Sequence, residues 1–466
     1  MSPTVNRRQF LRRSLCGGMG GIPLLNTLLN LKLAGSIAAA EPSGSDYRAL
    51  VCLFFPGGLD SYNMLAPRGA AEYAEYSAIR RDLALPRESL LPITPLQTAG
   101  LDLGLHPGMT EVQSLFGEGK AAFLANVGTL VEPVTRIGYE QGGAGLPLGL
   151  FSHADQIEQW QTSMPDLRSA RGWAGRAADV LSSLNTLQTV SMNISLSGSN
   201  VWQSGQHIVE YSVGPNGASG LLGHDPAAAG QGSLTGIRTR AVNAQLSATY
   251  GHLLTQAFQD KKLQTMGADT LFNSATNVTL PSSVTWPSGY LSGLLQMVAR
   301  AIAGHGSLGH TRQTFFVQYG SWDHHDEVLN NMAGQIPGFS ATVGAFYRTL
   351  EALGLQDQVT LFTASDFART LTSNGEGSDH AWGGNHLVVG GAVRGGRIYG
   401  QYPSLYPDNP LDVGRGRLIP TLSVDEYFAE LALWLGVPRS SLPLVLPNIG
   451  RFYNTAGSSA PVGFLV

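Results

Sequence analysis

The chain has 466 residues, of which 43% are hydrophobic, 13% are charged and 58 are glycine. Intrinsic disorder requires low hydrophobicity with high charge, so this composition excludes a disordered chain and predicts a core of ordinary size. The formal net charge of −4 excludes a nucleic-acid-binding surface, which needs clustered cations to neutralise phosphates. A dedicated surface for anionic membranes is disfavoured for the same reason.

The N-terminus has the pattern of an export signal. Arg7-Arg8 is followed by a weakly apolar, glycine-rich stretch and then by Ala38-Ala39-Ala40. This is the order of a charged region, an apolar region and a cleavage site. The paired arginines resemble a twin-arginine signal, with cleavage after Ala40. We therefore expect residues 1–40 to be removed, the twin-arginine export machinery to be a partner, and the protein to be periplasmic or secreted.

Removal of this segment makes the chain more acidic. The segment holds five of the 29 Lys and Arg residues and no acidic residue, so 24 basic and 33 acidic residues remain, a net charge of −9. Gly20, Gly21 and Pro23 interrupt its apolar stretch, which makes it a poor membrane span. No transmembrane anchor is expected after cleavage.

Short apolar runs and helix-period segments alternate along the rest of the chain. The apolar runs predict buried strands; in chain order they are 49–55, 121–127, 190–196, 314–319, 359–363 and 387–389. Apolar residues at helical spacing predict helices over 241–258, 291–303, 342–353 and 424–435. This alternation predicts an α/β fold with a mostly parallel central sheet covered by helices on both faces.

The domain organisation is expected to be simple. The last predicted helix opens with Ser423-Val424-Asp425-Glu426, which is a capping box. Two glycine-rich stretches of low periodicity, 198–236 and 399–420, are expected to be surface loops or lids. Because no charged or proline-rich hinge separates two periodic halves, residues 41–466 are expected to form a single domain.

Carboxylates and imidazoles gather next to the ends of the predicted strands. They are Asp60, Asp323, His324, His325, Asp366, Asp379, His380 and His386. Ligands of an open parallel sheet bind beyond the carboxyl ends of its strands. If the strands are neighbours, these side chains meet at one rim of the sheet.

Such a group of side chains favours a divalent cation. Clustered carboxylates repel one another unless a cation lies between them, and a mixture of Asp and His suits Zn or Mn better than Mg or Ca. One or two such ions are expected. Simpler roles stay open: Asp60, Asp326 and Asp379 can be turn or cap residues. Arg369 can bind an oxyanion or pair with Asp366.

The other histidines are expected to be structural or exposed. Four of the 11 histidines fall in the two short segments 324–325 and 380–386. The remaining seven are His106, His153, His207, His224, His252, His305 and His310.

Seven motifs together resemble a bacterial family of twin-arginine-exported proteins of unknown function, which is grouped with the alkaline phosphatase/sulfatase superfamily. The resemblance covers nearly the whole chain. The motifs are Pro56-Gly57-Gly58-Leu59-Asp60, Ser152-His153-Ala154-Asp155-Gln156 with Trp160-Gln161-Thr162, Gly172-Trp173, Trp322-Asp323-His324-His325, Ser365-Asp366-Phe367-Ala368-Arg369-Thr370, Asp379-His380-Ala381-Trp382-Gly383, and Gly416-Arg417 through Pro420-Thr421.

The resemblance implies an alkaline phosphatase-like fold, a three-layer α/β/α sandwich, with a two-metal site. The metal residues that it implies are Asp60, Asp323, His325 (or His324), Asp366, His380 and His386. The nucleophile of the superfamily, at a helix start, corresponds to Ser152, with Ser61 as the second candidate. Arg369 would stabilise developing charge. Where the superfamily usually has an Asp-His dipeptide, this chain has Asp366-Phe367, which removes one expected imidazole.

Two functions of different classes follow. The leading hypothesis is an exported metal-dependent hydrolase of phosphate or sulfate esters, with a small anionic ester as substrate. The alternative is a non-catalytic exported binding or assembly protein on a degenerate form of the same fold, motivated by the missing imidazole and the glycine-rich loops. A serine hydrolase of the α/β type has no support, because residues 41–466 contain no G-x-S-x-G motif.

Overall fold

The computed structural model describes residues 47–96, 101–142 and 145–466, so the expected export signal lies outside the described residues. Within them, a nine-stranded sheet has the order β11-β5-β10-β9-β1-β8-β6-β7, and β12 also pairs with β5. Its strands are β1 (Arg48–Phe55), β5 (Ala121–Gly128), β6 (Asn193–Ser195), β7 (Tyr211–Ser212), β8 (Arg312–Gln318), β9 (Val359–Ser365), β10 (Gly384–Gly390), β11 (Ile398–Gly400) and β12 (Leu422–Ser423). A second, antiparallel sheet consists of β2 (Leu65–Pro67), β4 (Leu103–Leu105) and β3 (Leu91–Ile93).

The central sheet is mostly parallel. β1 pairs in parallel with β8 on one side and with β9 on the other, and β6 continues the parallel set beyond β8. β10 is the exception, because it runs antiparallel to both β9 and β5. The first residues of β10 therefore lie at the same rim as the last residues of β9.

Helices surround the sheet and extend away from it. They are α2 (Ser61–Met64), α3 (Ala70–Arg80), α4 (Thr110–Gly117), α5 (Arg136–Glu140), α6 (His153–Thr162), α7 (Trp173–Leu181), α8 (Leu234–Ser247), α9 (Leu253–Ala275), α10 (Tyr290–Ala303), α11 (His305–Leu308), α12 (Val328–Ala352), α13 (Val424–Leu435) and α14 (Leu442–Val445). Within the described residues, no helix is long and apolar enough to span a membrane.

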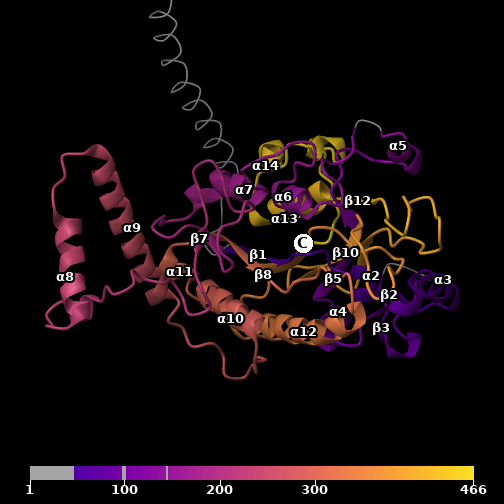
Figure 1. Cartoon of the computed structure of the whole chain (residues 1–466), viewed down its shortest axis with the longest axis horizontal. Coiled ribbons are helices and arrows are strands. Elements are labelled where there is room, and N and C mark those ends of the chain that lie inside the picture. The colour runs from indigo at the N-terminus through magenta and orange to yellow at the C-terminus, as the bar shows by residue number, and fades with distance from the viewer. Residues whose placement is uncertain (1–46, 97–100, 143–144) are drawn as a thin grey trace, which may run out of the picture.

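Alternating side chains of the central strands contact two separate apolar cores. Ala49, Val51 and Leu53 of β1 pack in a cluster with residues of α4, α10 and α12. Leu50 and Cys52 pack on the opposite face with residues of α7, α13 and α14. Figure 1 shows α10 and α12 below the sheet and α7, α13 and α14 above it. Both faces of the sheet are thus covered, as a buried parallel sheet requires.

Most of the predicted elements are present. All six predicted strands occur, with β6 shorter than its apolar run. The capping box is confirmed, since Ser423 Oγ accepts the Glu426 N–H at 3.1 Å and Glu426 accepts the Ser423 N–H at 3.0 Å. Two helix predictions were wrong: α12 starts at Val328 rather than at 342, and residues 248–252 interrupt the helix predicted over 241–258.

The two glycine-rich stretches differ in regularity. Residues 198–236 contain β7, a short 3₁₀ turn and the start of α8, and are otherwise irregular. Residues 401–420 follow β11 and contain no helix or extended strand. Both are connections, as expected, and a lid function for them stays a prediction.

Candidate metal centre

Four chain segments bring the candidate residues to one rim of the sheet. Asp323 lies in the segment that follows β8, and Asp366 comes directly after β9. Because β10 is antiparallel to β9, the segment that precedes β10 reaches the same rim and carries His380. The fourth segment is the start of α6, which contributes His153.

Three histidine side chains approach Asp323 with their Nε2 atoms. The Nε2 atoms of His153, His325 and His380 lie 3.4, 3.0 and 3.4 Å from carboxylate oxygens of Asp323. The Nε2 atoms of His325 and His380 are 3.3 Å apart. One ligand atom each from His153, Asp323 and His380 lies within 4.8 Å of the others.

The other nitrogen of each ring faces an acceptor. The Nδ1 contacts are His153 to Asp366 at 2.7 Å, His380 to the carbonyl oxygen of Phe151 at 2.8 Å, and His325 to Asp379 at 3.1 Å. In the neutral tautomer that carries its proton on Nδ1, which these acceptors can receive, the Nε2 lone pair of the ring is free. Three lone pairs and one carboxylate therefore converge, which is the arrangement a metal ion needs.

The spacing of these atoms fits a small divalent cation. Zinc binds imidazole nitrogen and carboxylate oxygen at about 2.0–2.2 Å in a tetrahedral arrangement, so two ligand atoms lie roughly 3.3–3.5 Å apart. The distances of 3.0–3.4 Å around Asp323 are close to this value. Nε2 of His153 is buried and makes no hydrogen bond, and a buried polar atom of this kind normally has a partner. A cation would satisfy it.

Asp323 is held in place by a buried guanidinium. Nη1 of Arg369 lies 2.6 Å from Asp323, and Arg369 itself is completely buried. Burial opposes ionisation of Asp323, but the hydrogen bond and charge of Arg369, together with His325 and His153, outweigh it. The pKa of Asp323 is therefore lowered, and this carboxylate is ionised at neutral pH.

Asp366 orients His153. Its Oδ2 accepts the backbone N–H of Gly57 at 3.0 Å in addition to the His153 proton. Burial raises the pKa of Asp366, while the hydrogen bonds from His153 and Gly57 act against this rise. A carboxylate behind a metal-binding imidazole fixes both the tautomer and the direction of the ring. Gly57 also lets the backbone before Asp323 approach closely, because a Cβ at Gly57 would lie 2.5 Å from the backbone nitrogen of Asp323.

His380 is fixed by both backbone and ring contacts. Phe151, whose carbonyl accepts the His380 proton, has a φ of 71°, a conformation that costs energy for a residue with a side chain. The ring of Phe367 stacks on His380 at 4.6 Å and lies 4.8 Å from His153. Burial lowers the pKa of His380 despite the hydrogen bond to Phe151, so the ring is neutral at pH 7 and can act as a ligand.

A protein-family model matches the region of the chain that contains this cluster. The model, described as "Protein of unknown function (DUF1501)", matches residues 47–414. The chain belongs to the DUF1501 family. The matched range contains the entire His153–Asp323–His380 cluster, and no curated protein matches the sequence.

Some solved structures are distantly similar to this DUF1501 protein. Ps i-CgsB in complex with k-i-k-neocarrahexaose has 9% sequence identity and a TM-score of 0.33, over 84% of this chain and 72% of that chain. The PsFucS1 sulfatase from Pseudoalteromonas sp. has 10% identity and a TM-score of 0.32, over 89% and 72%. TM-scores this low establish neither a shared fold nor a shared activity.

Asp60 of this DUF1501 protein is not in the cluster. Its carboxylate forms an ion pair with Arg80, and both side chains are almost completely buried. Arg80 also donates to the carbonyl oxygen of Thr370 at 3.1 Å. Asp60 was expected in the metal group, but the structure pairs it with Arg80 of α3 and places it outside the group of His153, Asp323 and His380.

The two predicted serine nucleophiles have structural contacts. Ser152 Oγ accepts the N–H of Asp155 at 3.5 Å and caps α6. Ser61 is buried, and its Oγ accepts the N–H of Asn385 at 2.9 Å. Ser152 adjoins His153 in sequence, so a role at the site stays a prediction, whereas Ser61 is closed off from solvent.

Arg369 forms its ion pair with Asp323. Its Nη1 contacts Asp323 and the carbonyl oxygen of Gly57. Its other nitrogens contact Ser378. The buried guanidinium therefore pairs with Asp323 rather than with Asp366. A role of Arg369 towards an oxyanion stays a prediction.

His153 is the functional residue that the sequence interpretation missed. We expected it to be structural or exposed, and the structure places it between Asp366 and Asp323. The motif Ser152-His153-Ala154-Asp155 was recognised, but only for its serine. The sequence signal that could have found His153 was its position: it is the first residue of α6 and follows Ser152, which caps this helix.

His324 and His386 are outside the group formed by His153, Asp323 and His380. His324 is buried, and its ring lies 5.8 Å from that of Trp322, so His325 is the neighbour of Asp323 that reaches the cluster. His386 lies inside β10, where its ring packs 4.6 Å from Trp160 and its Nδ1 lies 3.5 Å from the Thr363 hydroxyl. His386 was expected in the metal group, but its side chain packs in the core between Trp160 of α6 and Tyr427 of α13.

Removal of the buried His386 is expected to weaken the pH dependence of stability. Burial lowers its pKa from 6.5 to about 3, so the folded ring stays neutral while the unfolded ring becomes charged below pH 6.5. The free energy of unfolding therefore falls as pH drops from 6.5 towards 3, by up to about 1.4 kcal/mol per pH unit for this residue. His386→Leu should show a shallower fall between pH 6.5 and 4.5 in urea unfolding.

The exposed His207 provides the matched control for this test. His207→Leu should leave the pH dependence of wild type unchanged. An equal slope in wild type and His386→Leu would contradict a neutral buried imidazole.

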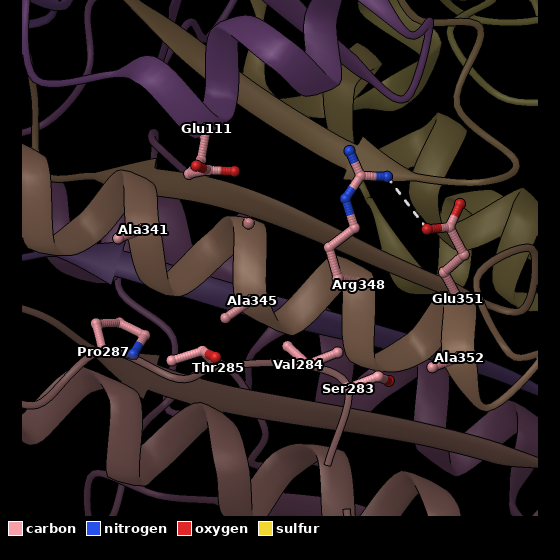
Figure 2. A pocket seen from close by; sticks show the side chains of 11 residues that line it. Glu111, Ser283, Val284, Thr285, Pro287, Ala341, Ala345, Arg348, Glu351 and Ala352 are labelled. Carbon is pink, nitrogen blue, oxygen red and sulfur yellow. Dashed lines mark hydrogen bonds and ion pairs between the residues drawn. The ribbon is translucent and has the colours of Figure 1, made fainter. Parts of the chain in front are cut away.

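A separate groove lies away from the cluster. Its volume is about 620 Å³, and its lining comes from α4, α12 and residues 283–287 (Figure 2). Its cation, Arg348, already contacts Glu118 and Glu351. None of the cluster residues lines this groove.

Proposed function

We propose that the cluster binds one divalent cation, Zn or Mn, and that the protein hydrolyses small phosphate or sulfate esters. The observation that supports this most strongly is the convergence of three Nε2 lone pairs on Asp323, each fixed by an acceptor behind its ring. The chemistry of the ligand set, imidazole with one carboxylate, suits Zn or Mn. His153, Asp323 and His380 would hold the ion, with His325 beside them.

A single ion is more consistent with the described residues than two. Asp60 is neutralised by Arg80, His386 is in the core, and Asp366 lies behind His153, so three of the expected ligands are absent from the cluster. Among the described residues, one group of three side chains could hold a metal ion: His153, Asp323 and His380. A second ion would need ligands from elsewhere.

The protein's own residues prepare the site for an anionic ester. Asp366 fixes His153, Arg369 fixes Asp323, and Phe367 packs against two of the imidazoles. The cation would supply Lewis acidity towards an ester oxygen and neutralise developing negative charge. His153, Asp323, His325 and His380 are all partly exposed. A small substrate can therefore reach them from solvent.

The export of the protein and its fold type are part of the same proposal. We infer that the chain is exported through the twin-arginine pathway to the periplasm or beyond, which the Arg7-Arg8 pattern supports. We also infer an α/β/α sandwich of the alkaline phosphatase type. The mostly parallel sheet with helices on both faces supports that inference.

Metal loading with an ester assay tests the function. We expect protein stripped with a chelator to rebind about one Zn or Mn per chain and to hydrolyse a generic aryl phosphate or aryl sulfate only when loaded. Less than about one tenth of an ion per chain together with no turnover would overturn the proposal. One bound ion without turnover would favour the alternative, a binding or assembly protein.

A further inference from the structure

The connection between β11 and β12 places an arginine beside the metal cluster. Nε of Arg417 donates to the backbone carbonyl oxygen of His380 at 3.1 Å, and the guanidinium lies over the ring of Phe151 at 4.9 Å. The carbonyl oxygen of Phe151 in turn faces Nδ1 of His380 at 2.8 Å. Arg417 therefore contacts one residue of the cluster and the residue that orients it.

The charge of Arg417 has no acidic partner among the described residues. Two other arginines at this rim are neutralised, Arg369 by Asp323 and Arg415 by Asp379. In the described part of the chain, both Nη groups of Arg417 are left without a hydrogen bond, and both are accessible to solvent. The paired N–H groups of a guanidinium match two oxygens of a carboxylate, sulfate or phosphate.

A tight turn fixes the backbone that carries Arg417. Oδ1 of the buried Asp412 accepts the backbone N–H groups of Gly414 and Gly416 at 2.8 and 2.9 Å. Gly416 has a φ of 70°, and a Cβ there would lie 2.4 Å from the Cβ of Leu371. An anion-binding group that is held before its ligand arrives loses less conformational entropy on binding.

Arg417 and the proposed ion are at opposite ends of the His380 side chain. Arg417 contacts the backbone carbonyl of His380, whereas Nε2, the ring atom that faces Asp323, would bind the ion. The His380 side chain thus separates the guanidinium from the reacting ester. A substrate that reaches both needs a second anionic group at a distance from the ester.

We propose that Arg417 binds a second oxyanion of the substrate, so that the protein prefers esters that carry a further carboxylate, sulfate or phosphate. This inference rests on the ester hydrolysis proposed above, because it names a substrate class for the same site. It also gives a role to the Gly416-Arg417 motif, which contributes no metal ligand.

Kinetics with paired substrates test the inference in the metal-loaded full chain. Carboxyphenyl phosphates and sulfates, as meta and para isomers, are compared with their methyl carboxylates, which lack the second charge; sulfophenyl analogues show which oxyanion is preferred. Arg417→Met removes the charge and keeps an unbranched stem over Phe151. It should lower the preference for the charged member of a pair, measured as the ratio of kcat/KM values, about tenfold and through KM, as expected for one charge-assisted contact.

Arg439 provides the matched control. Its guanidinium also lies over a ring, that of Tyr453 at 5.5 Å, and donates to one backbone carbonyl, that of Ser459 at 2.9 Å. Arg439→Met should keep the preference of wild type, and Arg417→Lys should restore part of it. An unchanged preference in Arg417→Met would overturn the inference. Equal losses of kcat with both members of a pair, or loss of the metal, would overturn it too, because Arg417 would then only position His380.

Calorimetry separates this inference from the proposed hydrolysis. Carboxyphenylphosphonate, which has no ester bond to hydrolyse, is titrated into metal-loaded wild type and Arg417→Met, with its methyl carboxylate as the uncharged partner. Tighter binding of the carboxylate by wild type alone, without turnover of any ester, would reject the hydrolysis and retain the oxyanion site. Equal affinities of the two proteins for the carboxylate, or no binding by either, would overturn the role of Arg417 even if esters are hydrolysed.

Discussion

Asp323→Asn is expected to lower bound metal to less than about one tenth of an ion per chain and to reduce ester turnover by about 10³-fold. Asp323 is the carboxylate on which three imidazoles converge, so the ion loses the negative charge that holds it. Electrostatic stabilisation by a bound ion is worth several kcal/mol, and about 4 kcal/mol corresponds to 10³-fold in rate. Metal content and turnover, both measured on reloaded protein, check this result.

Two features make the Asp323 test specific. Asparagine keeps an oxygen that can accept from Arg369, so the buried guanidinium keeps an acceptor and the fold should survive, as thermal unfolding will show. Asp326 is an exposed acid three residues away, and Asp326→Asn should retain both metal and turnover. Retention of a full ion by a folded Asp323→Asn protein would contradict the ligand assignment.

Asp60→Ala is expected to destabilise the fold by about 3–5 kcal/mol without removing the metal. The ion pair with Arg80 is buried on both sides, and removal of one partner leaves an uncompensated buried charge. Because Asp60 is not in the metal-binding group, the folded fraction should still bind its ion. Urea unfolding and metal analysis on the same sample measure both effects.

The exposed pair of Arg136 and Asp408 is the matched control. Asp408→Ala should change the free energy of unfolding by less than about 1 kcal/mol, as is usual for exposed ion pairs. A folded and stable Asp60→Ala protein that has lost its metal would show that Asp60 is a ligand after all.

The fold was predictable because its strands are apolar on both faces. A strand buried on both sides reads as a short continuous apolar run, and 49–55 and 359–363 coincide with β1 and β9 to within two residues. The helix over 241–258 was predicted incorrectly, because α8 and α9 project from the body and carry no clear apolar face. The break between the two helices at residues 248–252 is therefore not marked by any change in the apolar periodicity of the sequence.

The candidate site was predictable only in part. Several candidate residues lie next to strand ends, and the strand order brings them to one rim of the sheet. They are Asp323, His325, Asp366, Arg369 and His380. Asp60 was expected there by the same rule, but its partner Arg80 comes from a separate helix, α3, which no local pattern of the sequence reveals. His153 comes from a helix rather than from a strand end, so the rule that found the other residues could not find it.

The assembly of the cluster from distant segments ties ion capture to folding. His153, Asp323 and His380 are far apart in the chain, so the three side chains approach one another only after α6, β8 and β10 have packed together. A ligand that binds only the native state stabilises it by about 2.7 kcal/mol at one hundred times its dissociation constant. The thermal midpoint of this protein should therefore track the supply of its ion, and a chain that folds before it crosses the membrane would take its metal from the compartment in which it was made.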